Sequence, residues 1–201
     1  MPNRRNLLIL AAASLTSPIA RRASAQAPAG RAEAFIKDFG DNLVAVVNGP
    51  GTPQAKRPKL AAIVEKAVDL DGVALFCLGR YWRSATSEQQ RRYTALFHQV
   101  LVTNIMAKLG EYQGVHFTMG RVQTRMDDAV VSTVVERPNN PPAKVDWVVS
   151  PGTDSRITDV VADGTSFRLT QRQDYQSYLS RNNNSIDALI SAMQHEVSQA
   201  L

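Results

Sequence analysis

The hydrophobic residues of this 201-residue chain change their spacing twice, and this change constrains the fold more than any other feature. From Arg31 to about Tyr112 they recur every three or four positions, which is the period of an amphipathic helix. Between Val115 and Ala162 they recur at every second position, as in strands with one buried face. Helical spacing returns from Thr170. Helices, then strands, then helices predict an α+β domain.

The N-terminal half predicts four helices separated by turn-forming residues. We expect them over about 31–47, 54–68, 69–78 and 87–112. Thr86 and Gln89 form a capping-box pattern, in which the hydroxyl accepts from the third amide and the glutamine reaches back. Asp69 is expected to cap the third helix and Gly79 to end it. Asp69 and Asp71 could also form a paired-carboxylate site, but capping is the simpler interpretation.

Four strands are expected over 115–124, 129–136, 143–150 and 156–162. Short turns rich in Pro, Gly, Asn and Asp join them, which predicts an antiparallel meander. In the third strand, Val145, Trp147 and Val149 share one face. Helices follow over 170–181 and 186–197. The expected architecture is a four-stranded antiparallel sheet packed with N-terminal and C-terminal helices.

The first 25 residues have the order of segments that a secretory signal peptide requires. Arg4 and Arg5 precede an apolar run over 7–15, which is too short to span a bilayer, and Ala23-Ser-Ala25 is a cleavage pattern. We expect a mature start near Gln26 and a periplasmic location, with the paired arginines favouring twin-arginine export. The alternative, an amphipathic helix of a cytosolic protein, does not account for the cleavage pattern.

Removing the leader also changes the charge of the chain. Four of its 23 Lys and Arg residues precede residue 26, whereas none of its 18 acidic residues does, so the net charge falls from +5 to +1. A nucleic-acid partner is therefore not expected, since it would require a basic excess. A flexible tail over 26–32 and a single domain over 33–201 complete the predicted organisation.

Residues suited to catalysis are few and scattered. His98, His116 and His195 lie far apart, and the sequence has no Cys-x-x-Cys or His-x-x-x-His spacing, phosphate loop or dinucleotide motif. Cys77 is the only cysteine, which excludes an internal disulfide, and its apolar neighbours predict burial. We expect no metal, no cofactor and no enzymatic activity, with His98 in a structural role.

One segment, Leu78–Gln89 (LGRYWRSATSEQ), is unusually specific. It is followed in order by Val145-Asp-Trp147, Ile157-Thr-Asp-Val160, Gly164-Thr-Ser166 and Gln171-Arg172 with Tyr175 and Ser177. This ordered set resembles the MlaC/toluene-tolerance family of periplasmic lipid-carrier proteins, which includes members associated with hopanoid synthesis. The resemblance extends from about Glu33 to Val197.

The resemblance implies a soluble carrier without metal or catalysis. It would hold the acyl chains of a phospholipid in an apolar pocket between helices and sheet, and carry the lipid between an outer-membrane lipoprotein complex and an inner-membrane ABC transporter complex with its substrate-binding subunit. A hopanoid-like lipid is the alternative cargo. The candidate lining residues are Leu75, Leu78, Tyr81, Phe97, Leu101, Ile105, Tyr112, Val131, Val145, Trp147 and Val149.

Two other classes of protein remain possible from the residues alone. A small periplasmic enzyme acting on an apolar substrate would need grouped titratable side chains, and the candidates Arg80, His98, Asp146 and Asp159 are dispersed in sequence. An interaction or scaffold protein would use the same apolar residues as an ordinary core, and a structure without a cavity would favour it.

Overall fold

The computed structural model describes residues 20–107, 109–150 and 154–199, so most of the predicted signal peptide lies outside it. The N-terminal elements are α1 (Ala20–Asn48), α2 (Pro53–Ala67), α3 (Leu70–Leu78), the 3-10 helix η1 (Gly79–Arg83), α4 (Ser87–Ala107) and the 3-10 helix η2 (Leu109–Tyr112). The strands are β1 (His116–Arg125), β2 (Asp128–Glu136), β3 (Ala143–Val149), β4 (Ile157–Ala162) and β5 (Thr165–Ser166). The last described elements are α5 (Phe167–Arg181) and α6 (Ile186–Gln199).

The strands form one antiparallel sheet in the order β1-β2-β3-β4-β5, which confirms the α+β class and the meander. The prediction of four strands is wrong, because β5 adds a fifth strand of two residues. A strand of two residues is too short to show the alternation of apolar and polar side chains by which the other strands were predicted. Its turn does carry a signal: Asp163 and Gly164 have φ angles of 48° and 83°, and Asp-Gly is typical of tight hairpin turns.

The first helix begins earlier than its apolar pattern indicates. It starts at Ala20 and includes residues 26–32, for which the sequence predicts a flexible tail. Three of these seven residues are alanine, the strongest helix former, although the stretch also holds Pro28 and Gly30, the two types with the lowest helix propensity. At the other end, Asn48 donates a hydrogen bond to the Val115 carbonyl (2.9 Å) and accepts one from the Gly114 amide (2.8 Å). The end of α1 is thereby fixed to the start of β1.

The predicted caps of α3 and α4 are confirmed. The Gln89 amide donates to Thr86 Oγ1 (3.1 Å), and the Thr86 amide donates to Gln89 Oε1 (3.0 Å), so the capping box satisfies two amides of the first turn of α4. Asp69 Oδ1 accepts from the Gly72 amide (3.1 Å) at the start of α3. Its role in the structure is therefore that of a capping residue.

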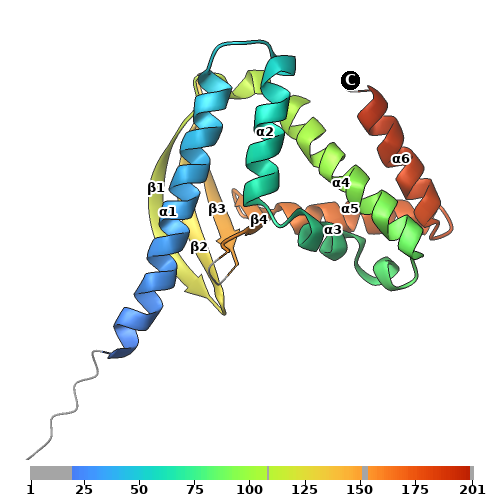
Figure 1. Ribbon diagram of the computed structural model, residues 1–201, viewed down its shortest axis with the longest axis horizontal. Helices are drawn as coiled ribbons and strands as arrows, with labels where there is room; N and C mark the ends of the chain where they lie inside the picture. The colour runs from blue at the N-terminus through green and yellow to red at the C-terminus, as the bar shows by residue number, and fades with distance from the viewer. Residues whose placement is uncertain (1–19, 108, 151–153, 200–201) are drawn as a thin grey trace, which may run out of the picture.

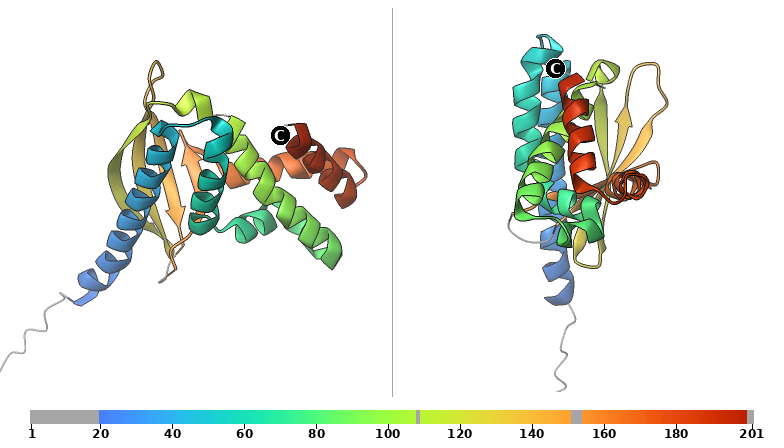
Figure 2. Two further views of the ribbon diagram at one scale, coloured as in Figure 1. Left: turned by 45° about the horizontal axis from the view of Figure 1, so that its top comes forward. Right: turned by 90° about the vertical axis from the view of Figure 1, so that its right-hand side faces the viewer.

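The elements fall into two parts (Figure 1), and α2 contacts both of them, through α1 on one side and α4 on the other. On one side, α1 lies across a face of the sheet and contacts β1 and β2. On the other side, α3, α4, α5 and α6 pack together. The right-hand view of Figure 2 places α1 and α2 on the same side of the sheet. No helix among the described residues is long and apolar enough to cross a membrane.

Three groups of buried apolar side chains follow this division. The helical core joins α3, α4, α5 and α6 and contains Tyr93, Phe97 and Leu179. The sheet core lies between α1 and the strands and contains Ile36 and Val131. A smaller junction cluster, built around Val47, Leu60 and Val115, has Met106 of α4 packed against it. The N-terminal half of α4 therefore belongs to the helical core and its C-terminal end to the junction cluster.

Candidate functional site

The predicted lining residues do not surround one common cavity. Six of them belong to the two large cores: Leu78, Tyr81 and Phe97 to the helical core, and Val131, Trp147 and Val149 to the sheet core. Trp147 packs edge-to-face on Phe39 of α1, with ring centroids 5.4 Å apart, and its indole N–H donates to Thr133 Oγ1 (2.9 Å).

The other five lining candidates lie in four different settings. Tyr112 packs against the junction cluster, and Val145 is buried on the inner face of β3. Leu101 and Ile105 are half-buried on α4. Leu75 is 47% exposed on α3. Most of these candidates thus lie in clusters of buried side chains, and their role as the lining of a lipid pocket stays a prediction.

The candidate site is an open cleft of about 550 Å³ where α3, η1, β4 and α5 meet. We call it the arginine cleft, because four arginines contribute to its wall. Its lining residues are Asp69, Gly72, Val73, Leu75, Phe76, Gly79, Arg80, Trp82, Arg83, Thr158, Arg168 and Arg172. Asp69 is the single acidic residue among them, so the lining of the cleft is cationic. Phe76 and Trp82 contribute aromatic side chains to the same lining.

Two of these arginines stack on one aromatic ring. The guanidinium carbons of Arg168 and Arg172 lie 4.7 Å and 4.9 Å from the centroid of Phe76, so that the face of the ring stabilises both charges. Arg172 also donates to the Phe76 carbonyl at 3.3 Å. These contacts tie α5 to α3 and hold both guanidinium groups at the cleft.

Gly79 allows the close approach of Arg172. Its backbone has φ 59° and ψ −126°, a conformation that side chains with a Cβ rarely adopt. A Cβ at this position would lie 3.0 Å from Arg172 Nη2. Glycine is therefore required here both for the end of α3 and for the position of the guanidinium group.

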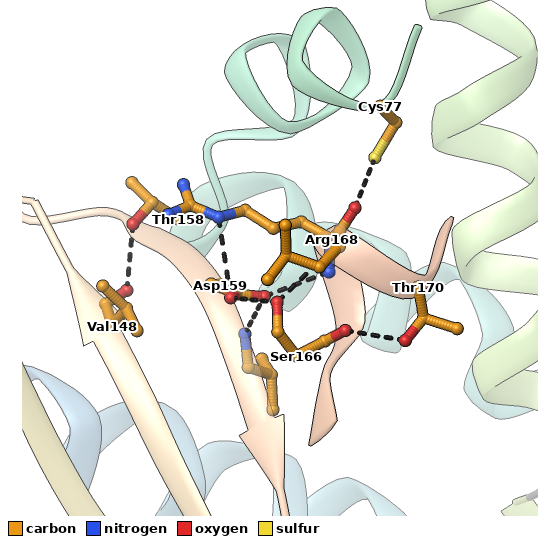
Figure 3. A network of polar contacts seen from close by, with 9 residues as sticks. Cys77, Val148, Thr158, Asp159, Ser166, Arg168 and Thr170 are labelled. Atoms are coloured by element: carbon orange, nitrogen blue, oxygen red, sulfur yellow. Dashed lines mark hydrogen bonds and ion pairs between the residues drawn. The ribbon is translucent and has the colours of Figure 1, made fainter. Parts of the chain in front are cut away.

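Asp159 of β4 lies next to the lining residue Thr158 and holds the lining residue Arg168 in place (Figure 3). Its carboxylate is only 6% exposed and accepts hydrogen bonds from the amides of Val160 (2.9 Å) and Arg168 (3.1 Å) and from Ser166 Oγ (2.6 Å). Arg168 Nε lies 3.5 Å from Asp159 Oδ2 as an ion pair. Ser166 in turn caps α5 by accepting from the Leu169 amide (3.2 Å). One buried carboxylate thus fixes the start of α5 and the base of the Arg168 side chain.

Cys77 lies behind this network and is fully buried, as its apolar neighbours predict. Its thiol donates to the Arg168 carbonyl at 3.6 Å. Burial, with a smaller contribution from the negative charge of Asp159, raises the pKa of Cys77 to about 12. The thiol therefore stays protonated and is a poor nucleophile.

The candidates for an enzyme make separate contacts. His98 Nε2 lies 3.0 Å from Asp71 Oδ1 and joins α4 to α3. Asp146 accepts from Ser132 Oγ (2.6 Å) on the sheet, and Arg80 donates to the Tyr81 hydroxyl (3.2 Å). Among the described residues, no group of three or more His, Cys, Asp or Glu side chains could hold a metal ion. His98, Asp146 and Arg80 thus have three different partners among the described residues.

Two comparisons with known proteins bear on this arrangement. Residues 37–195 match the family model described as MlaC protein. This chain belongs to the MlaC family. Its fold is also that of a phospholipid-binding protein from Ralstonia solanacearum whose structure was determined in complex with a phospholipid. The TM-score is 0.73 at 19% identity over 84% of this chain and 97% of the other. No curated protein matches the chain.

The family resemblance that the sequence indicated is therefore confirmed, whereas the arginine cleft was missed. A signal for it was present. Arg80 and Arg83 are three residues apart in a 3-10 helix, and Arg168 and Arg172 are four apart in an α-helix, so each pair shares one face of its element. That the two pairs meet depends on the packing of α5 against α3, which no local pattern reveals.

Proposed function

We propose that this chain is a periplasmic lipid carrier that binds the acyl chains of a phospholipid between its sheet and its helices. The observation that carries the proposal is membership of the MlaC family over residues 37–195. The Ralstonia solanacearum protein, which holds a phospholipid, supports it through a shared fold. The lipid would pass between outer-membrane and inner-membrane transport complexes.

The division of the fold suggests where the acyl chains are held. The sheet core and the helical core are separate, and α4 passes from the helical core to the junction cluster. Leu101 and Ile105 lie on this part of α4 and are only half-buried. Separating the two parts would expose the apolar faces of both, and each methylene of an acyl chain placed there contributes about 0.8 kcal/mol.

In this proposal the acyl chains enter between the two parts of the fold. Binding of a lipid stabilises a more open conformation, and a transport complex that favours one of the two conformations takes up or releases the lipid. The network around Asp159 joins β4 to the start of α5, so this edge of the sheet would remain attached to the helical part while the two parts separate elsewhere. The proposal requires no covalent step.

The test is native mass spectrometry of the protein purified from the periplasm, followed by lipid extraction. A charge in the acyl channel has no partner and must be desolvated, so Leu101→Glu and Val145→Glu are expected to give folded protein without lipid. Matched controls are Ala95→Glu, at an exposed position of α4, and Val134→Glu, on the outer face of β2 opposite Lys144. Both controls should retain lipid.

Absence of lipid from the wild type, together with failure of Leu101→Glu and Val145→Glu to fold, would contradict the carrier function. That result would favour the scaffold alternative, in which these residues form only a core. Circular dichroism of each variant separates loss of lipid from loss of fold.

A further inference from the structure

The arginine cleft carries more positive charge than its surroundings neutralise. Four arginines line it, whereas two carboxylates lie close to them: Asp159 forms an ion pair with Arg168, and Asp69, the acidic lining residue, already accepts a hydrogen bond from the Gly72 amide. The chain that remains after the predicted cleavage has a net charge of only +1. The positive charge in this cleft is therefore a local concentration.

Most N–H donors of these guanidinium groups are unused by the described residues. A guanidinium group has five such donors. Arg172 donates to the Phe76 carbonyl and Arg80 to the Tyr81 hydroxyl, whereas Arg83 makes no hydrogen bond or ion pair within the described part of the chain. The Nε of Arg168 is buried and has no hydrogen-bond partner there, with the Asp159 carboxylate 3.5 Å away.

The stacking geometry leaves these donors available to an anion. A guanidinium group that lies over an aromatic face presents its N–H groups at the edge of its plane, where a phosphate or carboxylate accepts two of them at once. Phe76 supports two such groups, and η1 provides two more arginines at the same cleft. Leu75, Phe76 and Trp82 place apolar surface directly beside the charges.

We propose that the arginine cleft binds the phosphate group of the lipid cargo, with Leu75, Phe76 and Trp82 against the glycerol and the first methylenes of the acyl chains. The inference rests on the proposed carrier function and names the residues that would hold the phosphate. A lipid with a phosphate satisfies the arginines, whereas a hopanoid-like polycycle without phosphate leaves them unpaired.

The test measures affinity of lipid-free protein by calorimetry at low salt for three probes: dihexanoyl phosphatidic acid, dihexanoylglycerol and inorganic phosphate. The variant is Arg80→Gln/Arg83→Gln. Its matched control, Arg121→Gln/Arg125→Gln, removes the same charge from exposed positions of β1. We expect the η1 variant to bind the phosphatidic acid about tenfold more weakly or worse, because charge-assisted hydrogen bonds are lost. Its affinity for dihexanoylglycerol and the affinities of the control should be unchanged.

Each other outcome has a distinct meaning. Equal affinity of the wild type for phosphatidic acid and dihexanoylglycerol, unaltered in the η1 variant, overturns the phosphate site and leaves the carrier function intact. Inorganic phosphate binding as tightly as phosphatidic acid overturns the assignment to a lipid headgroup. Failure of the wild type to bind either diacyl lipid overturns the carrier function itself. If the double variant is unfolded, Arg83→Glu at the exposed position of η1 replaces it, with the same expected loss.

Discussion

Replacement of Asp159 by alanine tests the structural argument for the cleft most directly. The carboxylate is almost completely buried and accepts three hydrogen bonds, two of them from Ser166 and Arg168 at the start of α5. It also forms an ion pair with Arg168. Removing the carboxylate leaves the Ser166 hydroxyl and the Arg168 amide without an acceptor, and each unsatisfied buried donor costs about 1–3 kcal/mol, so the total is about 3–5 kcal/mol. We expect Asp159→Ala to lower the free energy of unfolding by about this amount.

For a domain of this size, that loss corresponds to a decrease in Tm of roughly 6–20 °C. The measurement is urea unfolding followed by circular dichroism, with a thermal melt in parallel. Asp159→Asn is the matched control, because it retains the carbonyl acceptor on Oδ1 and removes the charge. It should be destabilised less than the alanine variant. A change within about 0.5 kcal/mol of wild type in Asp159→Ala would refute the role assigned to the carboxylate, since surface substitutions fall in that range.

Four further outcomes are expected. Gly79→Ala should lower the free energy of unfolding by about 1–3 kcal/mol, because the backbone conformation at this position favours glycine and a Cβ would contact Arg172. Urea unfolding measures this change, and a neutral effect would contradict the role assigned to Gly79. The Cys77 thiol, with its pKa raised to about 12, should resist iodoacetamide at pH 8 in folded protein and react after unfolding. Because the unfolded thiol releases its proton near pH 9 and the folded thiol does not, stability should fall between about pH 9 and 12, and less so in Cys77→Ala. His98→Ala should change the free energy of unfolding by less than about 1 kcal/mol, since the contact of His98 with Asp71 is partly exposed, and it should leave lipid binding intact. Loss of lipid from the folded variant would support the enzyme hypothesis instead.

Local patterns in the sequence determined most of the secondary structure. The change from a helical period to a period of two placed the sheet between two groups of helices, and the capping box at Thr86 and Gln89 placed the start of α4. Val145, Trp147 and Val149 were correctly assigned to one face of β3, because side chains alternate along a strand. The two-residue β5 was missed for the same reason, since it is too short to alternate.

The family was also readable from the sequence, because it depends on the order and spacing of motifs along the chain. Short-range rules gave the burial of Cys77 and the capping role of Asp69. The cap is decided by neighbours within a few residues, so its contacts are in view in the sequence.

Only the tertiary structure decided which distant residues meet. It distributed seven of the eleven lining candidates over three different clusters, because apolar character does not specify which cluster a side chain joins. It also brought Arg80 and Arg83 of η1 to the same cleft as Arg168 and Arg172, some ninety positions later in the chain. That juxtaposition follows from the packing of α5 on α3 and from the buried carboxylate of Asp159, and both are contacts between segments that the sequence keeps far apart.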